Sequence, residues 1–134
     1  MLEGVSKIKA WQLADKLALE VYRVTKEFPR DEIYGLTSQM RRAAVSVAAN
    51  ITEGAQRQTY KDYLNFLYTA KGSLAEVEYH VHLSQQLGYL SDVQVGGLAT
   101  LEDEAARTLH GLIVWVENQI AAGHAKKLTP VERP

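Results

Sequence analysis

The 134-residue chain has no cysteine, few prolines and no long hydrophobic run. The absence of cysteine excludes disulfides, a cysteine nucleophile and metal sites ligated by thiolates. The longest uncharged, mainly apolar stretch, residues 43–52, is too short to span a bilayer, so no membrane partner is expected. The N-terminal residues lack the apolar segment of a secretory signal, and we therefore expect a cytoplasmic protein.

An excess of basic residues is also absent. Fifteen Lys and Arg residues oppose sixteen Asp and Glu residues, which gives a net charge of −1. Proteins that hold nucleic acid mainly through phosphates carry a clear excess of positive charge. We therefore expect any binding of generic RNA to be weak and to disappear with added salt. An acidic run, residues 102–104, is interpreted as a solvated helix face.

Helical periodicity is the main pattern that the chain does show. Apolar residues recur at intervals of three and four, as they do on one face of an α-helix, and no proline occurs between Pro29 and Pro130. The pattern predicts helices at about residues 9–28, 37–53, 60–87 and 92–122. Four such helices with short connections predict an all-α fold, an antiparallel up-down-up-down four-helix bundle in one domain, residues 1–123. The polar segment 124–134 is expected to be a disordered tail.

Residues at the helix ends agree with these limits. Thr37 or Ser38 is expected to cap the second helix, and Gly54 to end it. Thr59 and Ser91 begin two capping boxes, in which a hydroxyl and a side chain three residues later satisfy the first amides of a helix. These signals place the predicted third and fourth helices.

A line of polar side chains runs along the second predicted helix among alanines. Five polar residues at spacings of 3, 4, 4 and 3 share one face of it, and the third predicted helix has a matching set. Because buried polar groups need partners, we expect a structural polar network between the two helices, with Arg42 paired to Glu76 or to Glu53 of a neighbouring subunit. The network consists of Gln39, Arg42, Ser46, Asn50, Glu53, Ser73, Glu76 and His80.

The same segment carries a family resemblance. Residues 34–54, YGLTSQMRRAAVSVAANITEG, resemble the signature of the 23S rRNA intervening-sequence protein family. Further pieces agree in order and spacing over about Ile8 to Leu90. They are Trp11 with Gln12 and Ala14, Phe28 with Pro29, residues 61–63 and residues 73–76.

The resemblance implies a small cytosolic bacterial four-helix bundle. The accessory variability protein of diversity-generating retroelements is similar in fold to this family, forms a homopentamer, and binds a reverse transcriptase and nucleic acid. The resemblance therefore implies a homopentamer here and, less directly, nucleic-acid binding. The retroelement protein is strongly basic, whereas this chain is not.

Catalytic and metal-binding patterns are scarce. No Glu has a His three residues later, as a di-metal bundle site needs, and His80 and His82 point in different directions on a helix. No metal and no cofactor is expected. Glu76 and His80, with Ser73 or Ser46 as nucleophile, form one possible acid–base site, although the same residues fit a polar network equally well.

Other residues are candidates for contacts with partners. Arg57, Tyr60 and Lys61 lie at the corner between the second and third helices, where Tyr60 and Tyr63 can stack on unpaired bases. Arg41 is a second candidate for a partner-facing group. Apolar residues that exceed one core-facing stripe on the first and fourth helices predict an oligomer interface. Its members are Trp11, Tyr22 and Trp115. Leu98 and Ile113 also lie off the main apolar line of the fourth helix.

The leading hypothesis is a non-enzymatic homopentameric scaffold that binds a macromolecular partner, either RNA or DNA or an enzyme that acts on nucleic acid. No small-molecule substrate is evident. The alternative is a small enzyme with an acid–base site at Ser73, Glu76 and His80. A network closed off by protein favours the structural role, whereas a cleft open to solvent favours the enzyme.

Overall fold

The computed structural model describes residues 2–125, and these residues form helices without strands. The four long helices are α1 (Lys9–Thr25), α2 (Leu36–Ala55), α3 (Tyr60–Gln86) and α4 (Asp92–Ala121). Two short 3-10 helices, η1 (Val5–Lys7) and η2 (Arg30–Glu32), precede α1 and α2 and were not predicted. The all-α prediction is confirmed. Most of the predicted tail, residues 126–134, lies outside the described residues.

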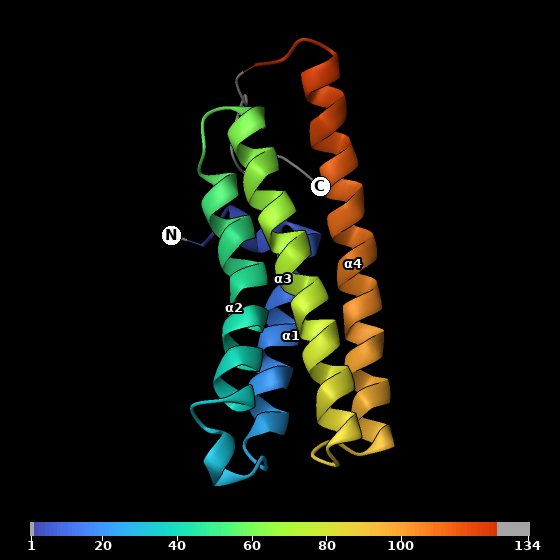
Figure 1. The fold of residues 1–134 in the computed structure, drawn as a ribbon. Coiled ribbons are helices and arrows are strands. Elements are labelled where there is room, and N and C mark those ends of the chain that lie inside the picture. Colours follow the sequence, from blue (N-terminus) through green and yellow to red (C-terminus); the bar gives the residue numbers. More distant parts are fainter. Residues whose placement is uncertain (1, 126–134) are drawn as a thin grey trace.

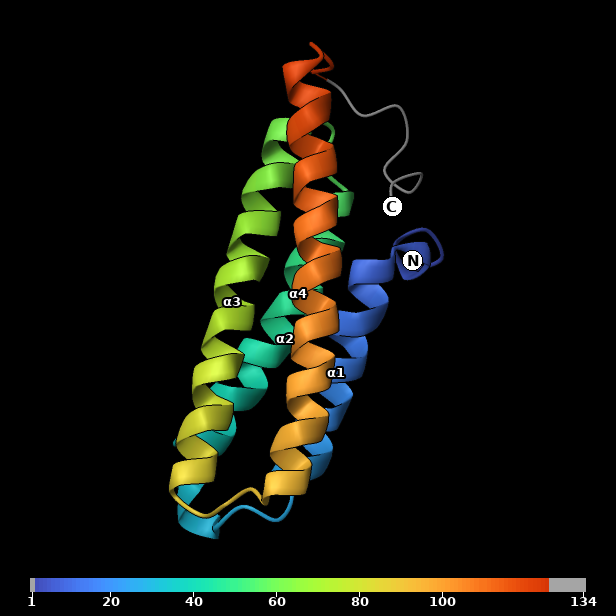
Figure 2. The same cartoon turned by 90° about the vertical axis from the view of Figure 1, so that its right-hand side faces the viewer.

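The four helices form an antiparallel bundle. Each helix packs against the next in chain order, and α4 returns to pack against α1 (Figure 1). Figure 2 shows α4 between α3 and α1. This up-down-up-down arrangement is the predicted four-helix bundle. No helix within residues 2–125 has the length and apolar content needed to cross a bilayer.

Local hydrogen bonds explain where the helices begin. The Thr59 hydroxyl accepts a hydrogen bond from the Asp62 amide at 3.1 Å, and Ser91 and Gln94 form a complete capping box. The predicted capping residue of α2 is wrong. Neither Thr37 nor Ser38 caps this helix, because it already begins at Leu36. The amide of Leu36 donates instead to the Glu32 carboxylate at 3.2 Å. A cap from the preceding η2 therefore replaces the expected hydroxyl.

Gly54 does not end α2, as the sequence had suggested, because the helix continues through it to Ala55. A Cβ at Gly54 would lie 2.8 Å from both the Tyr63 ring and the Phe66 Cβ. Gly54 therefore permits a close approach between α2 and α3. A glycine with φ of +79°, Gly88, follows α3.

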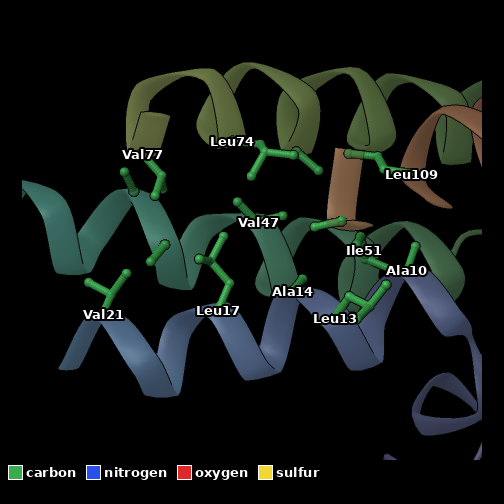
Figure 3. Packing of buried hydrophobic residues seen from close by; sticks show 14 of the residues in the cluster. Ala10, Leu13, Ala14, Leu17, Val21, Val47, Ile51, Leu74, Val77 and Leu109 are labelled. Atoms are coloured by element: carbon green, nitrogen blue, oxygen red, sulfur yellow. The ribbon is translucent and has the colours of Figure 1, made fainter. Parts of the chain in front are cut away.

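The core lies along the whole length of α1 (Figure 3). Leu13 and Leu17 of α1 are buried together with Ile51 of α2, Leu74 of α3 and Leu109 of α4. Seven residues of α3 alternate at spacings of four and three, which is the heptad spacing of a buried helix seam, and all seven are buried. Its residues are Tyr63, Leu67, Ala70, Leu74, Val77, Val81 and Ser84.

The helices differ in length. With 30 residues α4 is about 45 Å long, whereas α1 with 17 residues is about 26 Å long. As a result α3 and α4 extend beyond the beginning of α1 (Figure 1). At the opposite end, the connections α1–α2 and α3–α4 are joined, since the Tyr89 hydroxyl donates to the Glu32 carboxylate at 2.9 Å. The Tyr89 ring also packs on Phe28 with 5.3 Å between ring centroids.

Candidate binding cleft between α2 and α3

The predicted polar lines of α2 and α3 meet at a pair of serines. The hydroxyl oxygens of Ser46 and Ser73 lie 2.8 Å apart, and the Asn50 amide donates to the Ser46 hydroxyl at 2.9 Å. Asn50 also donates to the Ser46 carbonyl at 2.8 Å. Three members of the predicted network are therefore joined by hydrogen bonds.

An open cleft of about 310 Å³ separates the two helices beside the serine pair. Six of the eight predicted network residues line the cleft, together with one apolar residue, Ala43. Asn50 and Glu53 do not line the cleft, and Glu53 is exposed. The lining consists of Gln39, Arg42, Ala43, Ser46, Ser73, Glu76 and His80.

The predicted buried ion pair is wrong. Arg42 and Glu76 are both exposed, and the ion pair found within residues 2–125 joins Arg23 to Glu20 on the surface of α1. Both side chains line an open cleft and are exposed to water, so neither charge needs a partner within the protein. A contact of Arg42 with Glu53 of another subunit stays a prediction.

His80 is the most enclosed titratable group of the cleft. Its side chain is only 8% exposed, and its Nδ1 atom has no hydrogen-bond partner. Burial lowers the pKa of His80, while the negative charge of Glu76 acts in the opposite direction. The imidazole is therefore neutral at physiological pH.

The cleft has the solvent access that the alternative enzyme hypothesis requires, but its side chains lack the arrangement of a catalytic site. The cleft is open to solvent, which an enzyme requires. The Ser73 hydroxyl, however, is bonded to Ser46, and no hydrogen bond joins it to His80 in the part of the chain that the structure describes. A serine nucleophile needs an adjacent base. Residues 2–125 also hold no group of three His, Asp or Glu side chains placed to bind a metal ion.

The predicted nucleic-acid contacts fall into two groups. Tyr60 is buried, with its ring edge-on to Trp115 at 5.8 Å between centroids, so its prediction as a base-stacking residue is wrong. Tyr63 is buried as well. Arg57 and Lys61 are exposed at the α2–α3 corner, where the Arg57 guanidinium lies 4.7 Å from the centre of the Phe66 ring.

Arg41 is held within the chain. Its guanidinium lies 4.6 Å from the centre of the Tyr22 ring, and its Nε donates to the Thr25 hydroxyl at 2.8 Å. This cation–π contact holds the outer surfaces of α1 and α2 together. Arg41 is therefore less available to a partner than the sequence had suggested.

The predicted oligomer-interface residues are only partly exposed. Trp11 is half-buried and its indole donates to the Thr52 hydroxyl at 2.9 Å, while Trp115 is half-buried and packs against the core. Leu98 and Ile113 are buried within the single chain, so the argument that they require another subunit is wrong. Their burial follows from the position of α4 between α1 and α3.

Sequence reasoning missed several exposed apolar residues, and two of them lie beside the Tyr22–Arg41 contact. Leu19 is 65% exposed and Val45 is 43% exposed. Leu19 lies three residues before Tyr22, and Val45 lies four residues after Arg41, so both are one helical turn from the Tyr22–Arg41 contact. Leu19 lies outside the apolar stripes of α1. This position in the sequence could have indicated that its side chain is exposed.

The acidic run also contains a residue that was misread. Glu102 was interpreted as part of a solvated face, but it is only 7% exposed and its Oε1 atom has no hydrogen-bond partner. Burial, with smaller contributions from the charges of Glu78 and Asp103, raises the pKa of Glu102 to about 7.

Comparison with known proteins places this bundle in a family. The chain belongs to the 23S rRNA-intervening sequence protein family, whose model matches residues 6–111. A similar solved structure is that of a protein with unknown function from the S23 ribosomal protein family of Bacteroides thetaiotaomicron, with a TM-score of 0.72. It is 23% identical, and the match covers 78% of this chain and 97% of that one. At this identity the likeness shows the fold alone. A search of curated proteins gives no match.

Proposed function

We propose that this chain is a non-enzymatic, self-assembling scaffold that holds a macromolecular partner, either a nucleic acid or an enzyme that acts on nucleic acid. The observation that carries the proposal is a set of exposed apolar side chains on α1 and α2. The absence of a hydrogen bond between Ser73 and the imidazole of His80 in the described chain supports a binding role over a catalytic one.

The exposed set, which we name the α1–α2 strip, consists of Leu19, Tyr22 and Val45. These side chains are 65%, 43% and 43% exposed. The contact between Arg41 and Tyr22 brings the outer surfaces of the two helices together and so gathers the strip in one place. Gathered apolar side chains on a soluble protein mark an interaction surface, and a second copy of the chain is the partner that we propose.

Ring closure follows if the strip meets a different face of the next subunit. Contacts between different faces close into a ring when the rotation per subunit fits. The number five comes from the resemblance to the homopentameric retroelement protein. Light scattering is expected to give a mass near that of five chains, and a monomer at micromolar concentration would contradict the proposal.

Two variants test the strip directly. Leu19→Asp and Val45→Asp place a charge that cannot be buried unpaired, so each is expected to lower the measured mass. Val93→Asp is a matched control, because Val93 is an exposed apolar residue outside the strip, at the start of α4. Trp115→Asp is less suitable, since it would also disturb the packing on Tyr60.

Partner binding is proposed at the exposed basic corner formed by Arg57 and Lys61. One copy of this corner is weak, but several copies on one assembly raise the overall affinity through multivalency. With a net charge of −1, binding to unselected RNA is expected to be weak at 50 mM salt and absent at 200 mM salt. Fluorescence anisotropy at both salt concentrations measures this, with Arg57→Gln/Lys61→Gln as the loss variant. A tight, salt-insensitive complex with unselected RNA would contradict this account.

A further inference from the structure

The cleft between α2 and α3 has two walls with matched spacing. Gln39, Arg42 and Ser46 occupy positions i, i+3 and i+7 of α2, and Ser73, Glu76 and His80 occupy the same positions of α3. The two helices are antiparallel, and the Ser46–Ser73 hydrogen bond sets their register. Arg42 and Glu76 therefore stand at one level of the cleft, and Gln39 and His80 stand at the next.

The two walls differ in their hydrogen-bonding chemistry. The α2 wall presents Arg42, whose guanidinium can only donate, and the α3 wall presents Glu76, whose carboxylate can only accept. The two side chains line the same cleft but form no ion pair with each other within residues 2–125. The cleft therefore contains one positive and one negative group held apart, with a formal sum of zero.

His80 supplies an independent observation. Its buried Nδ1 atom has no partner, and buried polar atoms without one are uncommon because their desolvation is uncompensated. A neutral imidazole has one nitrogen that accepts a hydrogen bond. Glu76 and His80 are four residues apart on α3 and share one wall of the cleft. Because Nδ1 of His80 is covered by protein, the exposed Glu76 carboxylate is the acceptor that a donor in the cleft reaches.

The serine pair supplies a free donor to the same space. Asn50 donates to the Ser46 hydroxyl, and one of the two serine hydroxyls donates to the other. One hydroxyl hydrogen remains unused, whichever serine acts as the donor. This hydrogen and the Arg42 guanidinium can together bind a single carboxylate.

Several ligand classes fit this lining poorly. A metal ion would find only two ligands, Glu76 and His80, in the presence of the positive charge of Arg42. A phosphate or a nucleic-acid backbone would be repelled by Glu76. An unpaired nucleobase needs an aromatic platform, and the cleft has no Phe, Tyr or Trp in its lining.

We propose that the cleft binds a small zwitterion of the free α-amino-acid class. The carboxylate of the ligand accepts from Arg42 and the serine pair, and its ammonium group donates to the exposed carboxylate of Glu76. The volume of about 310 Å³ lies at the lower end of the range for small-molecule sites. This site is independent of self-assembly and of the basic corner.

Isothermal titration calorimetry with the intact chain tests the ligand class. Each of the standard amino acids is titrated singly, followed by the N-acetyl and the carboxamide derivatives of the best binder. At least one amino acid is expected to bind, and each derivative, which lacks one of the two charges, is expected to bind at least tenfold more weakly. The absence of binding by every amino acid, or equal binding of parent and derivatives, would overturn the proposal.

Variants of the cleft test its location. Arg42→Gln and Glu76→Gln are each expected to weaken binding at least tenfold, whereas Arg107→Gln and Glu27→Gln, at exposed positions elsewhere, are expected to leave it unchanged. Because Arg42 and Glu76 are exposed, the fold should persist, and circular dichroism checks this. Titration with inorganic phosphate is the last arm. Phosphate binding by the unaltered chain that is as tight as binding of the best amino acid would show a simple anion site and overturn the zwitterion assignment.

Discussion

The interface between α2 and α3 and the interface between α3 and α4 both contain polar groups, but in opposite environments. Between α2 and α3 the polar groups either bond to each other, as Ser46 and Ser73 do, or face an open cleft. At α4 a single carboxyl, Glu102, is buried near Glu78 of α3 with one oxygen unpartnered. Access to water, more than polarity, therefore decides what a polar residue costs this bundle.

The largest effect expected from this difference is a pH dependence caused by Glu102. The folded chain holds the Glu102 pKa at about 7, above the ordinary carboxyl value of 4.5, so only the unfolded chain releases this proton between these pH values. Stability should therefore fall as pH rises from about 4.5 to about 7 and level off above it, by at most about 3 kcal/mol. Urea denaturation at a series of pH values measures the change.

The matched variants for this prediction are Glu102→Gln and Glu27→Gln. The first is neutral at every pH and is expected to remove most of the fall and to exceed the stability of the natural chain above pH 7. The second replaces an exposed carboxylate and is expected to leave the fall in place. Parallel pH curves for Glu102→Gln and the natural chain would contradict the assignment.

The next effect concerns the close approach of α2 and α3. Gly54→Ala places a methyl group 2.8 Å from Tyr63 and Phe66, and such overpacking costs about 1–3 kcal/mol. Alanine has a helix propensity up to about 1 kcal/mol more favourable than that of glycine, so a net loss of up to about 2 kcal/mol is expected. Gly72→Ala is the control, because a Cβ at Gly72 meets no atom within 4 Å and should stabilise α3. Equal denaturation midpoints for the two variants would show that the helices are not this close.

A smaller effect is expected at the serine pair. Ser73→Ala removes one partner of Ser46, but Ser46 keeps its bond from Asn50 and lies beside water in the cleft. The expected loss is about 0.5–1 kcal/mol. A double-mutant cycle with Ser46→Ala isolates the pairwise energy, and a coupling energy of zero would contradict the hydrogen bond. All variants need comparison at one protein concentration, because the proposed self-assembly would change the apparent stability.

The smallest effect is expected for Arg42→Ala. Because Arg42 is exposed and without an ion-pair partner in the described chain, its removal should change stability by less than about 0.5 kcal/mol. Arg107→Ala, at another exposed position, should behave alike. A loss of about 3 kcal/mol or more, as for a broken buried pair, would return Arg42 to the interior of an assembly.

The helices and the core were predictable because their signals are local. Hydroxyl caps such as Thr59 and Ser91 act within four residues, and the heptad seam of α3 is read directly from spacing. Gly54 was misread because a glycine that permits a close approach and a glycine that ends a helix look the same in a sequence. Only the position of Tyr63 across the interface distinguishes them.

The sequence predicted which residues line the candidate site, but not how deeply each of them is buried. Spacing identified the six polar residues that line the cleft, since it shows which side chains share a helix face. It does not show how far that face lies from the bundle axis, and so Arg42 was wrongly expected to be buried. For Glu102 a signal existed, because the residue falls at core spacing in the line Leu98, Glu102, Ala105 and Leu109, all of which are buried.

The unequal helix lengths have a consequence for the breathing of the bundle. At one end of the bundle the Tyr89–Glu32 hydrogen bond joins two connections. At the other end α4 extends beyond α1, so its last turns do not pack against α1. Local opening costs least where few neighbours must be displaced. Amide hydrogens in the last turns of α4 should therefore exchange with solvent long before those near Leu98. Local opening of the bundle is then expected to begin at the end of α4 and to reach the Tyr89–Glu32 end last.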